Sequence, residues 1–167
     1  MPNPSLQDAI KEAFASAPYN KVILDTLEIR QPTVQDPIFI VKSTRPIVAI
    51  DENSVSRTYR PAGFQFTMPS ENEEGFRSLT IAVDNIDRAV SDFIQVAKST
   101  KVPVQVIYRP YLADDLTQPA MNPPLSLYLK DIQVNEFQVT GRATFMDVVN
   151  QKFPSELYTR ARFPSLG

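Results

Sequence analysis

The chain has 167 residues, a formal net charge of −2, and neither histidine nor cysteine. The serine–histidine and cysteine–histidine nucleophile systems are therefore excluded, as are zinc sites built from cysteine and histidine. The slight negative charge argues against specific nucleic-acid binding through phosphate neutralisation. We expect a protein that is not an enzyme and needs no cofactor or metal, because the sequence places no carboxylate pair for acid–base chemistry.

A single domain over residues 1–167 is predicted, because a chain of this length can bury one sizeable core. No apolar run approaches the ~20 residues of a membrane-spanning helix, so no membrane segment is expected. The domain divides into an N-terminal helix (1–18), a β-rich core (19–149) and an extended C-terminal arm (150–167).

The N-terminal helix is predicted from apolar residues at helical spacing between Leu6 and Ala17, and Pro18 ends it. Whether this helix does more than cover the core is left open.

The next segment, Lys21 to Arg30, alternates as a strand does, with Leu24 and Thr26 on one face and Leu27 and Ile29 on the other. A loop is expected between Pro32 and Pro37. Further short strands are predicted over residues 38–41, 46–50, 55–60 and 64–68.

A second helix is predicted after an exposed acidic turn (70–75) and a strand with alternating apolar residues (79–83). Asp84 and Asn85 precede the helix, which should run from Ile86 to about Lys98. A calcium loop at Asp84–Asp87 is the alternative, but the glycine and the distant glutamate of such a loop are missing, so helix capping is favoured. The buried stripe of the helix is expected to be Ile86, Val90, Phe93, Ile94 and Ala97.

The remaining elements are a strand over 102–108, a proline-rich loop over 110–124 and a hairpin. In the hairpin, alternation over Leu125–Leu129 resumes after a shift at Ile132, and Asn135-Glu136 supplies the turn. The returning strand should carry the alternating residues Phe137, Val139, Gly141, Ala143 and Phe145. The expected fold class is α+β and mostly antiparallel, with the second helix lying across a sheet or β-sandwich.

Two segments are candidates for recognition. Tyr108, Arg109 and Tyr111 can form a secondary interface or a carbohydrate site, since an arginine between tyrosines stacks and hydrogen-bonds. The alternative is a strand end whose tyrosines cover the core.

The C-terminal arm is the stronger candidate, because it places three aromatics, two leucines and three cations around two Phe-Pro pairs. It can latch its own domain or bridge to another subunit, and residues alone leave both open. The subunit-interface residues expected in the arm are Phe153, Pro154, Tyr158, Thr159, Arg162, Phe163, Pro164 and Leu166.

Several stretches resemble a family of tailed-bacteriophage and prophage proteins encoded in the tail-tip module. The arm is similar to the family's ending, Asn-x-x-Phe-Pro-x-x-x-Tyr-Thr-x-x-x-Phe-Pro-Gly-Leu, with Ser165 in place of the usual glycine. The other similar stretches are residues 12–18, 24–29, 37–38, 81–88 and 108–112.

This resemblance implies a virion protein of the tail tip, of the distal tail, hub or minor tail type, made in the host cytoplasm. It also implies a tail-tube-like fold, in which two antiparallel sheets pack together with one flanking helix in addition to the N-terminal helix. It implies a ring, hexameric rather than trimeric, that connects the tail tube to the central hub, with the tail tube, hub and tape measure as partners. Two alternatives remain: a carbohydrate- or receptor-binding β-sandwich of the tail, and a tail-assembly factor absent from the virion.

Overall fold

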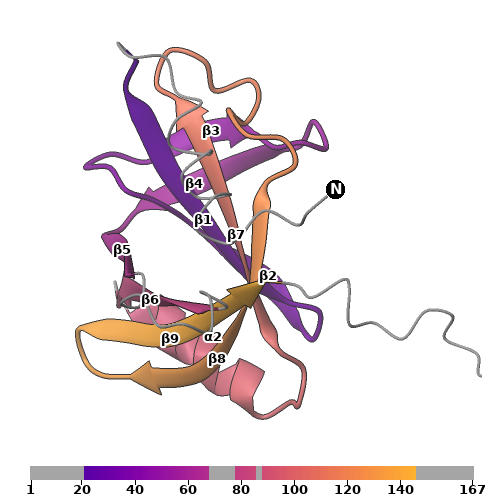
Figure 1. Cartoon of the computed structure of the whole chain (residues 1–167), viewed down its shortest axis with the longest axis vertical. Coiled ribbons are helices and arrows are strands. Elements are labelled where there is room, and N and C mark those ends of the chain that lie inside the picture. The colour runs from indigo at the N-terminus through magenta and orange to yellow at the C-terminus, as the bar shows by residue number, and fades with distance from the viewer. Residues whose placement is uncertain (1–20, 68–77, 86–87, 146–167) are drawn as a thin grey trace, which may run out of the picture.

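The fold is α+β and mostly antiparallel, as predicted. The computed structural model describes residues 21–67, 78–85 and 88–145. Within these ranges the chain forms a nine-stranded sheet and one α-helix (Figure 1). The predicted N-terminal helix, the acidic turn and the C-terminal arm lie outside the described residues. No helix within these ranges is long and apolar enough to cross a membrane.

The first five strands largely follow the predicted positions. The loop expected between Pro32 and Pro37 is wrong, because only two residues separate the first two strands and Pro37 lies within the second. The backbone nitrogen of Pro37 faces away from the first strand, so its missing hydrogen does not interrupt the ladder. The strands are β1 (Ile23–Gln31), β2 (Val34–Val41), β3 (Ile47–Ile50), β4 (Ser56–Pro61) and β5 (Phe64–Thr67).

The second half of the described chain contains the helix and four longer strands. The predicted strand at 102–108 begins later and runs further, through Pro110 to Leu112. The pairing of this strand with the next one ends at Tyr108 and Leu125. Pro110 lies beyond that last pair, so its missing N–H interrupts no hydrogen bond of the ladder. The elements are β6 (Ser78–Asp84), α2 (Ala89–Lys98), β7 (Val104–Leu112), β8 (Leu125–Val134) and β9 (Gln138–Phe145).

Helix α2 begins at Ala89, three residues later than predicted. Asn85 nevertheless acts near the helix start, since its side-chain oxygen accepts a hydrogen bond of 3.2 Å from the backbone N–H of Ser91. The predicted buried stripe is confirmed for Val90, Phe93, Ile94 and Ala97, while Ile86 lies outside the described residues. The N-cap position itself is Arg88, which has a positive φ of 58° and makes no capping side-chain hydrogen bond, so the predicted cap at Asp84-Asn85 is replaced by this one contact of Asn85 with the first turn.

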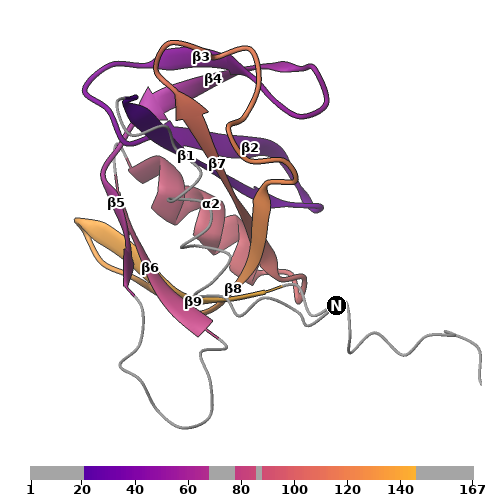
Figure 2. The same ribbon diagram turned by 45° about the horizontal axis from the view of Figure 1, so that its top comes forward.

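The strands are ordered β3-β4-β2-β1-β7-β8-β9-β6-β5. Strands β2 and β4 pair in parallel through Ile40–Val41 and Arg60–Pro61, and the other recorded pairs are antiparallel. The sheet folds over on itself, and α2 lies between β1 and β2 on one side and β6 and β9 on the other (Figure 2). The helix thus fills the space between two facing parts of one sheet.

The two faces of the central strands have different contents. In β1, Leu27 and Ile29 belong to the larger core around α2, together with Val106 and Tyr108 of β7. The opposite face carries a smaller cluster of Val41, Ala49, Tyr59 and Tyr111. This separation follows from the two-residue period of a strand.

The β8–β9 hairpin keeps the predicted shift and turn. The register shifts between Lys130 and Gln133, and Asp131 has a positive φ of 52°. The side-chain oxygen of Asn135 accepts hydrogen bonds from the backbone N–H groups of Phe137 and Gln138. The returning strand begins at Gln138, one residue later than predicted, so Phe137 belongs to the turn, where it is 80% exposed.

Candidate functional site

The structure places Tyr108, Arg109 and Tyr111 inside the subunit. Tyr108 packs in the core around α2, whereas Tyr111 belongs to the cluster on the opposite face. The three side chains are 2%, 2% and 0% exposed. The expectation that they form a secondary interface or a glycan site is not met, because a partner cannot reach them. The tyrosines cover the two cores, which is the alternative that the sequence left open.

Arg109 lies at the centre of a buried ion-pair network with Glu28 and Glu52, which we call the Arg109 network. Its Nε and Nη2 atoms donate to the two carboxylate oxygens of Glu52 at 2.6 and 2.8 Å, and its Nη1 atom donates to Glu28 at 2.5 Å. Such bidentate, charge-assisted hydrogen bonds are among the strongest in proteins. The network joins β7, β1 and the turn after β3.

The surroundings of this network fix its charge states. The hydrogen bond from Arg109 holds the pKa of Glu52 below its usual value, against the opposing effect of burial. Burial lowers the pKa of Arg109, but its hydrogen bonds with Glu52 and Glu28 outweigh this and raise it. Glu52 and Arg109 therefore stay charged at neutral pH.

A second polar cluster anchors the turn between β3 and β4. The carboxylate of Asp51 accepts hydrogen bonds from the backbone N–H groups of Asn53 and Val55 and from the Nε atom of Arg57. Burial opposes ionisation of Asp51, but these hydrogen bonds together prevail and its pKa is lowered. The hydroxyl of Tyr111 donates to the backbone oxygen of Ile50 at 3.0 Å.

These two polar clusters are structural. Within each cluster the charged groups pair with each other. Among the described residues, no buried side-chain nitrogen or oxygen is without a hydrogen-bond partner. Together they attach the β3–β4 hairpin to the face of β1 and β7 that is opposite α2.

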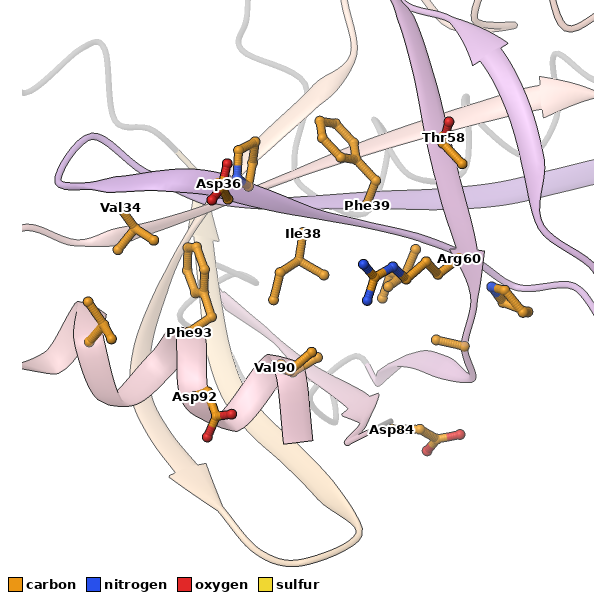
Figure 3. A pocket seen from close by; sticks show the side chains of 16 residues that line it. Val34, Asp36, Ile38, Phe39, Thr58, Arg60, Asp84, Val90, Asp92 and Phe93 are labelled. Atoms are coloured by element: carbon orange, nitrogen blue, oxygen red, sulfur yellow. The ribbon is translucent and has the colours of Figure 1, made fainter. Parts of the chain in front are cut away.

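A surface hollow that combines apolar and charged side chains lies between β2, β4 and α2, and we call it the α2 groove. Its volume is about 540 Å³, within the ~300–1,000 Å³ range of sites that take small ligands. Figure 3 shows Val90 and Phe93 extending from α2 toward β2, while Ile38 extends from β2 toward α2. The side chain of Arg60 reaches from β4 into the space between them.

Charged residues surround the apolar floor of the α2 groove. Asp36, Asp84 and Asp92 line it together with Arg60, so its formal charge is negative. No ion pair of Arg60 occurs within the described part of the chain. Asp92 lies in the first turn of α2, where a carboxylate also stabilises the helix dipole. Val96 on the same helix is 55% exposed, so the apolar lining continues onto the surface.

Residues 9–158 match the family described as Domain of unknown function (DUF1833). The chain belongs to the DUF1833 family. The match includes every described strand and α2, and it extends into the C-terminal arm as far as Tyr158. No curated protein matches this DUF1833 chain significantly.

Sequence reasoning about this DUF1833 member missed the α2 groove. The expected interface residues of the arm, from Phe153 to Leu166, lie outside the described residues. The groove is lined by residues such as Arg60 and Asp92, which are more than thirty positions apart, so no local spacing in the sequence predicts it. One signal in the sequence could have indicated the groove. Val96 is an apolar residue of α2 that falls outside the buried stripe of the helix and so has no core contact.

Proposed function

We propose that this protein is a structural subunit of a phage tail tip, in which copies assemble into a ring that connects the tail tube to the central hub. The observation that carries the proposal is the open edge of the sheet at β5. An edge strand presents unpaired backbone groups to which a strand of another molecule can add.

The register of β5 determines which groups face outward. The backbone N–H of Asp84 donates to the oxygen of Gly63, so Gly63 and Asp84 are a hydrogen-bonded pair. The next pairs alternate, and Phe64 and Phe66 therefore point their backbone N–H and C=O groups away from β6. No partner for these groups occurs among the described residues. The edge can accept a strand from a neighbouring copy.

The opposite edge differs, which favours an ordered ring over unlimited stacking. In β3, the backbone N–H of Ile50 donates to the oxygen of Leu116, and its oxygen accepts from Tyr111. The loop after β7 thus occupies part of this edge, and only one end of the sheet offers the longer open pairing surface in the described chain. Heterologous contacts between unlike surfaces close into rings when the rotation permits.

The resemblance of the chain to tail-tip proteins, including the ending with two Phe-Pro pairs, supports the same proposal. In this function the C-terminal arm docks on an adjacent protein. Burial of its large apolar side chains stabilises the contact by about 1.5–3 kcal/mol each before ordering costs.

Two measurements test the proposal. Mass spectrometry of purified particles should find the protein in the tail, and the native mass of the purified chain should correspond to a closed ring. Deletion of Phe153–Gly167 should leave the sheet folded and abolish ring formation or incorporation. A folded monomer that is absent from particles would refute the proposal, and unfolding of the truncated chain would identify the arm as an internal latch.

A pair of matched variants tests the β5 edge. Gln65→Lys places a charge on the exposed face of the edge strand, where it should hinder strand addition and reduce oligomer formation. Thr80→Lys places the same charge on the same face one strand further in, where β9 already pairs with β6, and should leave the oligomer intact. Equal effects of both variants would exclude β5 as the contact.

A further inference from the structure

We infer that the α2 groove is the receptor for the C-terminal arm of a second copy of this chain. This inference rests on the proposed function in one respect, since it takes the arm as a connection between subunits. It adds the surface that receives the arm and the chemistry of the contact.

The first argument is the match between the groove and the Phe-Pro pairs. Pockets that bind aromatic and proline side chains are concave and mostly apolar, with a few polar groups at the rim. The groove has this composition: Ile38, Val90 and Phe93 form the apolar part and Arg60 lies at one side. Proline fixes φ, so a Phe-Pro pair loses less conformational entropy on docking than an ordinary dipeptide does.

The second argument is charge. The groove carries three aspartates and one arginine, Asp36, Asp84, Asp92 and Arg60, and is therefore net negative. The arm carries three cations, Lys152, Arg160 and Arg162, and the single acid Glu156. A cation directly precedes each Phe-Pro pair, in Lys152-Phe153 and Arg162-Phe163. Opposite charges at the rim of an interface speed association and fix the register of the two partners.

The third argument is the length of chain after the sheet. Strand β9 ends at Phe145, and 22 residues follow it. An extended chain spans at most ~3.3–3.6 Å per residue, so this segment can reach about 70 Å. The arm is therefore long enough to reach the groove of a neighbouring copy, and the choice of a second copy over its own groove follows from the proposed function.

Cross-linking provides a direct test, because the chain has no native cysteine. Two full-length variants are mixed under mild oxidation: Val96→Cys, beside the groove, and Ser165→Cys, in the arm, with a tag on one of them. We expect a disulfide between the two chains. Val22→Cys is the matched control, since Val22 is 68% exposed and outside the groove, and it should not cross-link to Ser165→Cys.

Charge reversal tests the rim contacts. Asp36→Lys/Asp92→Lys should lower the cross-linking yield by about two- to five-fold, which corresponds to about 0.4–1 kcal/mol and lies within the range of exposed ion pairs. When this groove variant is mixed with an arm variant that carries Arg160→Glu/Arg162→Glu, the cross-linking yield should be restored. Reversal of two exposed acids elsewhere, Asp114→Lys/Asp131→Lys, should leave the yield unchanged.

The outcomes separate this inference from the proposed function. A double variant with both cysteines that forms only an intramolecular disulfide would overturn the inference and show a latch in cis. An assembled ring without any cross-link would also overturn it, while the proposed function stands. A cross-link between chains in a protein that is absent from particles would support the docking and refute the tail-tip function.

Discussion

Two arginines of this protein occupy opposite situations on neighbouring parts of one sheet. Arg109 is 2% exposed and donates to both Glu28 and Glu52, whereas Arg60 is exposed, lines the α2 groove and forms no ion pair within the described residues. A charge that is paired within the fold contributes to its stability and is not available to a ligand. A charge beside an apolar groove contributes little to stability and is available for binding.

The difference shows why residue type alone misleads about function. Arginine and tyrosine are enriched at interfaces, and Tyr108, Arg109 and Tyr111 have that composition. Their position in the central strand β7 places them inside the subunit, where the same hydrogen-bonding capacity holds the β3–β4 hairpin in place.

The largest expected effect is that of Arg109→Leu. Removing one partner of a buried ion pair leaves uncompensated carboxylates, so we expect a loss of about 3–5 kcal/mol in the free energy of unfolding. Urea denaturation of the variant and the parent chain measures it. A loss below about 1 kcal/mol would contradict the structural role of the Arg109 network.

Tyr111→Phe should cost about 1 kcal/mol, the typical net contribution of one hydrogen bond. The variant removes the hydroxyl that donates to Ile50 and leaves the ring in place. Tyr128→Phe on the half-buried part of β8 is the control, with a change near zero expected by the same denaturation measurement. Equal losses in both variants would mean that the contact with Ile50 contributes nothing specific.

The Arg109 network and the second polar cluster around Asp51 also predict a loss of stability in acid. The pKa of Glu52 lies below its ordinary value of 4.5 and that of Asp51 below its ordinary value of 3.8. Groups with lowered pKa values stabilise the fold above these ordinary values, and the stabilisation is lost as the pH falls through the pKa of the folded state. Free energies of unfolding between pH 7 and about pH 3 should decrease over this window.

The acid-induced decrease should be smaller in Arg109→Leu, because the pKa of Glu52 is lowered mainly by Arg109. Arg60→Ala should retain the full decrease. The same slope in all three proteins would assign the acid sensitivity to other groups.

Arg60→Ala has the smallest expected effect on stability, within about 0.5 kcal/mol, as for surface substitutions in general. Thermal unfolding tests this expectation. If the variant loses as much stability as Arg109→Leu, then Arg60 belongs to the packing of the fold and the contrast between the two arginines disappears.

Much of the fold was predictable because strand and helix periods depend on local alternation. Leu79, Ile81 and Val83 alternate and are buried in β6, and Val90, Phe93, Ile94 and Ala97 recur at helical spacing and are buried in α2. The errors occur where neighbours in the sheet decide. Pro37 and Pro110 look like loop residues, but each has its nitrogen where no ladder hydrogen bond is required.

The candidate site was predictable only in part. The composition of the arm is visible in the sequence, whereas the groove that we propose as its receptor combines β2, β4, the end of β6 and α2. Phe137 shows a boundary error, because it continues the alternating pattern of the returning strand and yet lies in the exposed turn before β9.

The sequence by itself determined the fold class and the positions of most elements, since these follow from side-chain periodicity. Only the tertiary structure decided which charges are paired. Arg109 is separated from Glu28 by 81 positions and from Glu52 by 57 positions in the sequence. The order of the strands in the sheet brings these residues together, and local sequence patterns do not encode that order. The same strand order left Arg60 beside an apolar groove instead of within the sheet's buried network.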